Sequence, residues 1–223
     1  MKTRVVLFIL FLGVAVIMAG AAARSKAGQP GSGTRPANAE SRFRLSSKIF
    51  EDGATIPPSM IANTTVGSVC DGLNQSPELS WTDAPEGTKS FVVTLYDKTA
   101  GVTHWGAYNI PPTIDKLDEN AGRHATAEVP FGAQVVNSVF FTFGHLGPCP
   151  PAGLVHHYEF TVYALDKEHL DLPSPAGFPP DPEALYRAMF EHVLEKSSIA
   201  GYLSCPADST PTATDPNPTG TCP

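Results

Sequence analysis

The sequence predicts a mainly β protein, an antiparallel β-sandwich with a C-terminal helix and short helical decorations. Four stretches are rich in β-branched and aromatic residues and repeat with a period of two, which is typical of strands. They are residues 90–97, 104–110, 138–143 and 157–165. Prolines and glycines separate these stretches and indicate turns. Many strands with a single late helix favour the sandwich.

The helix is expected near the end of the domain. Asp181 is a suitable N-cap residue, and Pro182 fits the first turn. Leu185, Met189 and Val193 then recur at a spacing of four residues, which places them on one face of a helix. We therefore expect a helix that begins at about Pro182 and includes Val193.

Composition excludes several classes of protein. Of the 223 residues, 42% are apolar and 17% are charged, so the chain is neither disordered nor a membrane protein with many spans. The 22 acidic residues outnumber the 15 basic ones, which gives a formal charge of −7. Nucleic acid requires a basic face to contact its phosphates, so we expect no nucleic-acid partner.

The chain divides into four segments. Residues 1–23 have the basic start, apolar run and small-residue cleavage sites of a signal peptide. Cleavage would release an exported protein, periplasmic or extracellular, whereas an uncleaved N-terminal anchor would tether it to the membrane. Residues 24–40 form a flexible Gly/Pro/Ser-rich linker, and 206–223 form a Pro/Thr-rich tail. A single domain without internal repeats occupies 41–205.

An exported chain keeps its cysteines in an oxidising compartment, where disulfides persist. The four cysteines, Cys70, Cys149, Cys205 and Cys222, permit three pairings. We favour Cys205–Cys222, which would close a loop of about 18 residues around the tail. Cys70 and Cys149, both beside Gly/Pro turns, would then pair with each other. Neither C-x-x-C nor H-x3-H spacing occurs, so we expect disulfides and no metal site.

Strand alternation sorts the polar side chains of two of the expected strands. Neighbours on a strand point to opposite faces, so His156 and Tyr158 share one face and His157 points away. Asp97 ends a strand whose other residues on that face are apolar. A carboxylate at this position can face a binding site, or it can satisfy the turn that follows, and one strand alone favours the turn.

Three ordered segments resemble the signature segments of the phosphatidylethanolamine-binding protein family. They are SPELSWTDAPEGTKSFVVTLYDKTA (76–100), THWGAYNIPP (103–112) and GHLGPCPPAGLVHHYEFTVYALD (144–166). The chain is most similar to the bacterial branch, often labelled Raf-kinase-inhibitor-like, over about residues 41–203. The resemblance implies a large antiparallel β-sandwich with a small pocket for phosphate-like or other small anions.

The resemblance assigns six residues to that pocket: Asp97, His104, Gly147, Pro148, His156 and Tyr158. The chain departs from the family's pattern around them. Lys98 and Thr99 replace a proline and a second aspartate, and His157 stands where arginine is common. His145 and Leu146 replace a Tyr-Gly pair, a change that could alter the width of the pocket.

The residue types in this set suit an oxyanion. Histidine, tyrosine and backbone N–H groups donate hydrogen bonds to anions, and Asp97 can orient a histidine. The glycines and prolines of 144–151 would form a stiff wall that a ligand can approach closely. The remaining histidines outside position 157 are expected to be structural: His124, His145, His169 and His192.

These expectations describe a non-enzymatic binding protein without a cofactor. Its partner would be a small phosphate-like anion or a phospholipid headgroup, with peripheral contact to a membrane. The alternative is an inhibitor of a protein partner. The branch label implies a kinase, but an exported chain does not meet a cytosolic kinase, so the expected partner is a secreted protease. A hydrolase has little support, since the chain has no G-x-S-x-G, no P-loop and no metal-ligand spacing.

Overall fold

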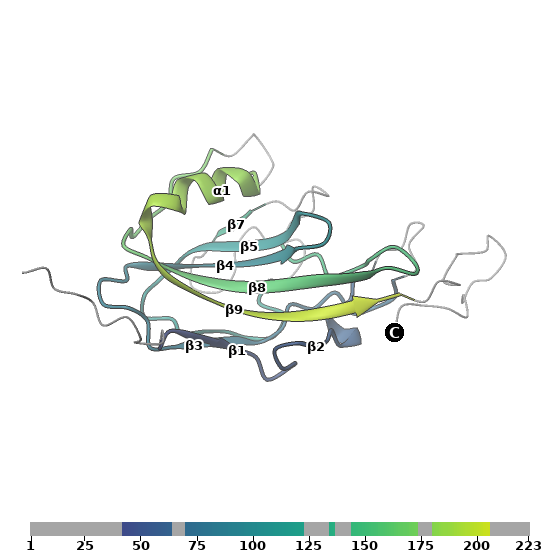
Figure 1. The fold of residues 1–223 in the computed structure, drawn as a ribbon. Coiled ribbons are helices and arrows are strands. Elements are labelled where there is room, and N and C mark those ends of the chain that lie inside the picture. The colour runs from purple at the N-terminus through teal and green to yellow at the C-terminus, as the bar shows by residue number, and fades with distance from the viewer. Residues whose placement is uncertain (1–41, 64–69, 123–133, 137–143, 174–179, 206–223) are drawn as a thin grey trace, which may run out of the picture. The chain divides into compact units, whose positions relative to one another are not determined.

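The computed structural model (Figure 1) describes residues 42–63, 70–122, 134–136, 144–173 and 180–205, with the backbone alone for 134–136. The predicted signal peptide, linker and tail lie outside the described residues, as does the strand expected at 138–143. No helix within the described segments is both long enough and apolar enough to cross a membrane.

Two sheets form the fold, which confirms the mainly β, antiparallel sandwich. In spatial order the larger sheet contains β2 (Ala54–Thr55), β9 (Val193–Ser204), β8 (Val155–Leu165), β4 (Ser90–Asp97), β5 (Val102–Ile110) and β7 (Gln134–Val136). All its neighbouring strands are antiparallel except β2 and β9. The smaller sheet contains β1 (Arg44–Ser46), β3 (Leu79–Thr82) and β6 (Lys116–Leu117).

The main core fills the space between the inner faces of the two sheets. Phe91, Val93 and Leu95 of β4 face it, as the period of two predicts. The Trp81 ring of the smaller sheet lies edge-on to Phe91, with ring centroids 5.3 Å apart. Aromatic contacts of this kind add to the hydrophobic burial that holds the two sheets together.

Helix α1 (Pro182–Met189) covers one end of the outer face of the larger sheet (Figure 1). Asp181 caps it as predicted, since its carboxylate accepts a hydrogen bond from the backbone N–H of Glu183 at 2.8 Å. Leu185 and Met189 pack against sheet residues in a second apolar cluster. Within the part of the chain that the structure describes, no other α-helix covers this outer face.

The helix is shorter than the sequence pattern predicts. A 3₁₀ turn, η3 (Phe190–His192), follows it, and Val193 begins β9 by pairing with Leu165 of β8. The spacing of apolar residues fits a helix up to Val193, but the pairing of two long strands determines the structure there. The twelve residues of β9 were not recognised as a strand from the sequence.

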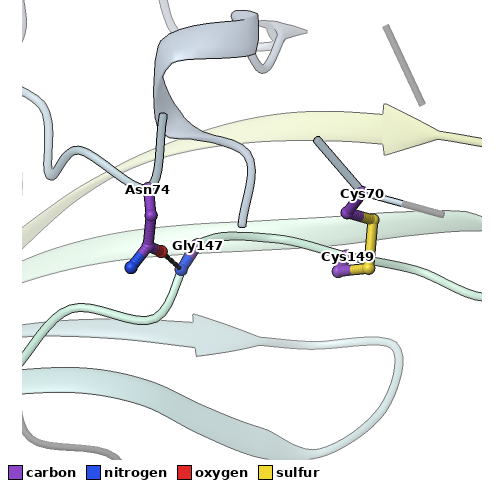
Figure 2. The surroundings of a disulfide bond; sticks show 4 residues. All are labelled: Cys70, Asn74, Gly147 and Cys149. Carbon is purple, nitrogen blue, oxygen red and sulfur yellow. Dashed lines mark hydrogen bonds between the residues drawn. A yellow bond between two sulfur atoms is a disulfide. The ribbon is translucent and has the colours of Figure 1, made fainter. Parts of the chain in front are cut away.

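A disulfide joins Cys70 to Cys149 (Figure 2), as predicted. It links the segment after the 3₁₀ turn η1 (Pro58–Met60) to the proline-rich segment that precedes β8. Cys205 is also disulfide-bonded, whereas Cys222, its expected partner, lies outside the described residues.

Candidate anion site at the end of strands β4, β5 and β8

Three strands of the larger sheet bring the predicted histidines to Asp97. The β4–β8 register places Asp97 opposite Tyr158, so His156 lies on the same inner face two residues away. His156 and Tyr158 are 7% and 1% exposed, whereas His157 lies on the outer face and its ring stacks on Tyr202. The predicted alternation of these neighbours is confirmed.

His104 reaches the same site through an irregularity in β5. Leu95 and Tyr96 are adjacent in β4 but pair with Trp105 and Thr103, so His104 is an extra residue between them. Such a β-bulge re-aims the side chains around it. Regular alternation would place His104 and Trp105 on opposite faces, yet both are buried, and His104 lies beside Asp97.

Asp97 is the centre of the site and is only 2% exposed. Its Oδ2 lies 2.6 Å from Nδ1 of His156 and 4.0 Å from Nε2 of His104. Its Oδ1 accepts hydrogen bonds from the backbone N–H groups of Thr99 and Ala100, at 2.8 and 2.9 Å. Asp97 therefore satisfies the β4–β5 turn and orients His156 at the same time, so the two readings of this residue are compatible.

These contacts determine the charge of Asp97. Burial alone would raise the pKa of the carboxyl, but hydrogen bonds from Ala100 and His156, the charge of His156 and a hydrogen bond from Thr99 together lower it. The carboxylate is consequently ionised at neutral pH. It presents a buried negative charge to the imidazole rings.

At His104, in contrast to Asp97, the effect of burial on the pKa outweighs that of the nearby polar groups. Burial lowers the pKa of its imidazole, although the Leu146 carbonyl, the Asp97 carboxylate and the Gly147 carbonyl all favour the protonated form. Nδ1 lies 3.0 Å from the Leu146 carbonyl oxygen, and because a carbonyl only accepts, Nδ1 carries the proton. A neutral His104 is thus held in one tautomer.

The Tyr158 ring lies near both histidine rings. Its ring centroid is 5.5 Å from that of His104 and 6.2 Å from that of His156. Burial raises the pKa of the phenol, and the charge of Asp97 raises it further. The hydroxyl therefore keeps its proton and donates it in a hydrogen bond to Asp97.

Gly147 and Pro148 form a wall beside these rings, and their polar groups are used within the protein. The Gly147 N–H donates to Oδ1 of Asn74 at 2.7 Å (Figure 2). The Pro148 carbonyl accepts from the N–H of Ala62 at 3.0 Å. A Cβ on Gly147 would lie 2.2 Å from the Met60 carbonyl oxygen, so only glycine fits. The wall therefore supplies shape and close packing. The Gly147 N–H is already bonded to Asn74, so it is not free to donate to a ligand.

Comparisons with known proteins identify the family of this chain. The sequence profile of the family described as "Phosphatidylethanolamine-binding protein" matches residues 46–204. This chain belongs to the phosphatidylethanolamine-binding protein family. It is 39% identical to the UPF0098 protein YbcL of Escherichia coli over 137 residues, which cover 59% of this chain and 73% of YbcL. YbhB of the same organism is 40% identical over 134 residues, 58% of this chain and 82% of YbhB.

Two further matches are a solved structure and a mycobacterial protein. The crystal structure of E. coli YbcL, titled a new member of the mammalian PEBP family, superposes with a TM-score of 0.64 at 30% identity and covers 73% of this chain and 98% of YbcL. A protein of Mycobacterium tuberculosis named putative lipoprotein LppC is 35% identical over 136 residues, 59% of this chain and 60% of LppC.

Residues that distinguish this family member on the rim also have structural partners. Lys98 forms an ion pair with Glu159 at 3.1 Å, and the Thr99 hydroxyl accepts a hydrogen bond from the His157 N–H at 3.0 Å. Both contacts tie the end of β4 to β8. Lys98 and Thr99 therefore connect the chain just after β4 with β8 beside the site.

The remaining histidines differ in their surroundings. His145 is fully buried against the Trp105 ring. Among the described residues, its ring nitrogens form no hydrogen bond of good geometry, although the nearby Asn74 backbone favours the protonated ring to some extent. Burial, and then the charge of His104, lower its pKa to about 3. His169 and His192 pair with nearby aspartates at the surface, and His124 lies outside the described residues.

Sequence reasoning missed Asn74, which holds the wall in place. Its amide accepts from Gly147 and donates to the His145 carbonyl at 3.3 Å, from a backbone with φ of 52°. Asparagine tolerates this left-handed conformation better than most residues, and that preference was the available sequence signal. Within the described residues, no group of three His, Cys, Asp or Glu side chains could hold a metal ion.

Proposed function

We propose that this family member is an exported, non-enzymatic binding protein with a small pocket for a phosphate-like anion, such as a phospholipid headgroup. The pocket comprises Asp97, His104, Gly147, Pro148, His156 and Tyr158. The observation that carries the proposal is the pair of histidines gathered around one buried carboxylate oxygen, 2.6 Å from His156 and 4.0 Å from His104.

The donors in this arrangement suit an anion. Asp97 receives Nδ1–H of His156, which directs the opposite ring nitrogen, Nε2, away from the carboxylate. When His156 is protonated, Nε2–H becomes a charged donor with a fixed direction. The Tyr158 hydroxyl is kept neutral by its raised pKa and donates to Asp97, which helps to hold the carboxylate in place.

Binding fits these residues better than catalysis. Asp97 is occupied by His156 and by two backbone N–H groups, so it is not a poised base. Cys149, which follows Pro148 in the wall, is in a disulfide and therefore has no nucleophilic thiolate. An Asp–His pair without an activated nucleophile can hold an anion without transforming it.

Export is supported by three independent features. The N-terminal sequence has the pattern of a signal peptide, and Cys70 and Cys149 form a disulfide that an oxidising compartment preserves. The relative from M. tuberculosis is named a putative lipoprotein. A phospholipid headgroup at a membrane surface is within reach of a protein in such a compartment.

Calorimetric titration of protein purified from the exported fraction tests the proposal. Phosphate and phosphoethanolamine should bind, and Asp97→Asn and His156→Gln should each weaken binding by about tenfold or more, because each removes a charge-assisted contact. His169→Gln, a surface change, is the matched control. Vesicles that contain phosphatidylethanolamine separate a membrane headgroup from the free anion. Unaltered affinity in both site variants would contradict the proposal, and absence of any anion binding would favour the protease inhibitor.

A further inference from the structure

The outer face of the larger sheet contains a second hollow, away from the anion site. Its volume is about 320 Å³, at the lower end of the range for small-molecule pockets. It lies beside α1, which contributes Tyr186 to its lining. Its lining consists of Thr94, Tyr96, Glu159, Thr161, Tyr163 and Tyr186, a set that we call the tyrosine hollow.

Strand register explains why these residues meet. Thr94 pairs with Thr161 and Tyr96 pairs with Glu159 across β4 and β8. Side chains alternate along each strand, so these residues point outward while Asp97, His156 and Tyr158 point inward. The sheet itself therefore separates the tyrosine hollow from the anion site, and a small ligand in one does not touch the other.

The floor of the hollow is polar and its sides are aromatic. Thr94 and Thr161 are 1% and 2% exposed, and the Thr161 hydroxyl lies 2.8 Å from that of Ser198. Burial raises the pKa of Tyr163 to about 12, and burial likewise raises the pKa of Tyr186. Both phenols are thus neutral, and their rings keep the negative π faces that attract cations.

Charged groups of both signs surround the hollow. Glu159 is the single charged residue in its lining. The protein already places ammonium groups at two edges of the hollow: Lys98 Nζ lies 3.1 Å from the Glu159 carboxylate, and Lys196 Nζ lies 6.0 Å from the centroid of the Tyr163 ring. The Lys98 side chain is 46% exposed, and ion pairs of such exposed groups contribute little, so a ligand can displace it at small cost.

We propose that the tyrosine hollow binds a small organic ammonium cation, with its charge against Glu159 and its alkyl groups against the tyrosine rings. This is a second binding activity, independent of the proposed anion pocket. Quaternary ammonium groups are recognised by aromatic side chains in this manner, through cation–π attraction and desolvation of the methyl groups. The formal charge of the whole chain, −7, also favours the approach of a cation.

Titration with choline chloride tests the proposal, with 3,3-dimethylbutan-1-ol as an uncharged probe of the same shape. Choline should bind about tenfold more tightly than the alcohol, because only choline has a charge for Glu159 and the rings. Glu159→Gln and Tyr163→Leu should each weaken choline binding by a similar factor. Asp97→Asn, on the opposite face of the sheet, should leave it unchanged.

Lys98→Met is the variant that separates this proposal from a general loss of structure. It removes the ammonium that competes for Glu159, so choline affinity should rise by roughly two- to fivefold. Urea unfolding of each variant identifies any that fail to fold. Three results would overturn the assignment. They are equal binding of choline and the alcohol, a lower choline affinity in Lys98→Met, and binding of maltose in place of choline.

Discussion

A single oxygen of Asp97, Oδ2, lies 2.6 Å from Nδ1 of His156 and 4.0 Å from Nε2 of His104. The two histidines come from different strands on opposite sides of β4, and the second Asp97 oxygen holds the turn between β4 and β5. The site and the turn therefore depend on the same carboxylate. A change at Asp97 should alter both stability and the proposed binding, and the two effects need to be measured separately.

The first prediction concerns the two roles of Asp97. Asp97→Ala leaves two backbone N–H groups and His156 without their acceptor, so it should lower the free energy of unfolding by roughly 2–4 kcal/mol. Asp97→Asn retains an acceptor for the turn and should cost about half as much. Urea denaturation measures both values. Equal costs for the two variants would mean that the turn contacts contribute nothing.

The second prediction concerns the wall. In Gly147→Ala the new Cβ meets the Met60 carbonyl oxygen at 2.2 Å and the Ala62 nitrogen at 2.6 Å, which are backbone atoms that cannot move aside. Gly53→Ala is the matched control, because Gly53 has φ of +78° but no atom within 4 Å of the added Cβ. The control should lose about 1–2 kcal/mol from backbone strain. Gly147→Ala should lose more and should also weaken anion binding; a smaller loss than in the control would refute the role of Gly147.

The third prediction concerns the disulfides. Cys70 and Cys149 are 79 residues apart, so replacing both with alanine should cost on the order of 4 kcal/mol in the chain-entropy account. Peptide mapping of exported protein should recover Cys70 joined to Cys149, and Cys205 joined to Cys222. A peptide that joins Cys70 to Cys222, or four free thiols, would be incompatible with this arrangement.

The fourth prediction uses the buried His145. Its pKa is about 3 in the folded protein and near 6.5 in the unfolded chain, so the unfolded state binds the extra proton between these values. Stability should therefore be complete above pH 6.5 and should fall by roughly 1 kcal/mol per pH unit as the pH drops towards 3. His104, whose pKa is also lowered, should add to this loss just below pH 6.5.

His145→Phe should reduce this acid destabilisation and should not weaken the protein at pH 7, because the neutral ring forms no hydrogen bond of good geometry with another described residue. His169→Gln is the control for removal of an exposed histidine. Thermal unfolding as a function of pH compares the three proteins. An unchanged pH slope in His145→Phe would show that another group accounts for the acid sensitivity.

The sequence pattern predicted those elements whose structure depends on residues close together in the chain. Residues 90–97 form β4 within the predicted limits, and Asp181 caps α1 as its sequence position indicates. Strand β9 was missed because its residues alternate weakly in hydrophobicity and pair with β8 over its full length. Pairing between strands that are distant in sequence is a tertiary effect that residue preferences do not contain.

The candidate site was predicted from family resemblance more than from pattern. Alternation placed His156 and Tyr158 together, but it gave no reason to bring His104 to Asp97. That approach depends on the bulge in β5, which has no clear signal in the sequence. Asn74 was missed for a related reason, since it acts from a loop on the Gly147 N–H, far away in the chain.

The most direct test of the anion pocket is the pH dependence of binding to methanesulfonate, whose own charge is constant across the range where phosphate titrates. Burial lowers the pKa of His104, and a bound anion would raise it again, so the complex holds more protons than the free protein. Affinity should therefore fall as pH rises from about 5.5 to 8, by up to about tenfold per pH unit for each proton taken up. Calorimetry in two buffers with different ionisation enthalpies should detect that proton uptake, and His104→Gln should reduce it. A flat pH profile without proton uptake would contradict the account.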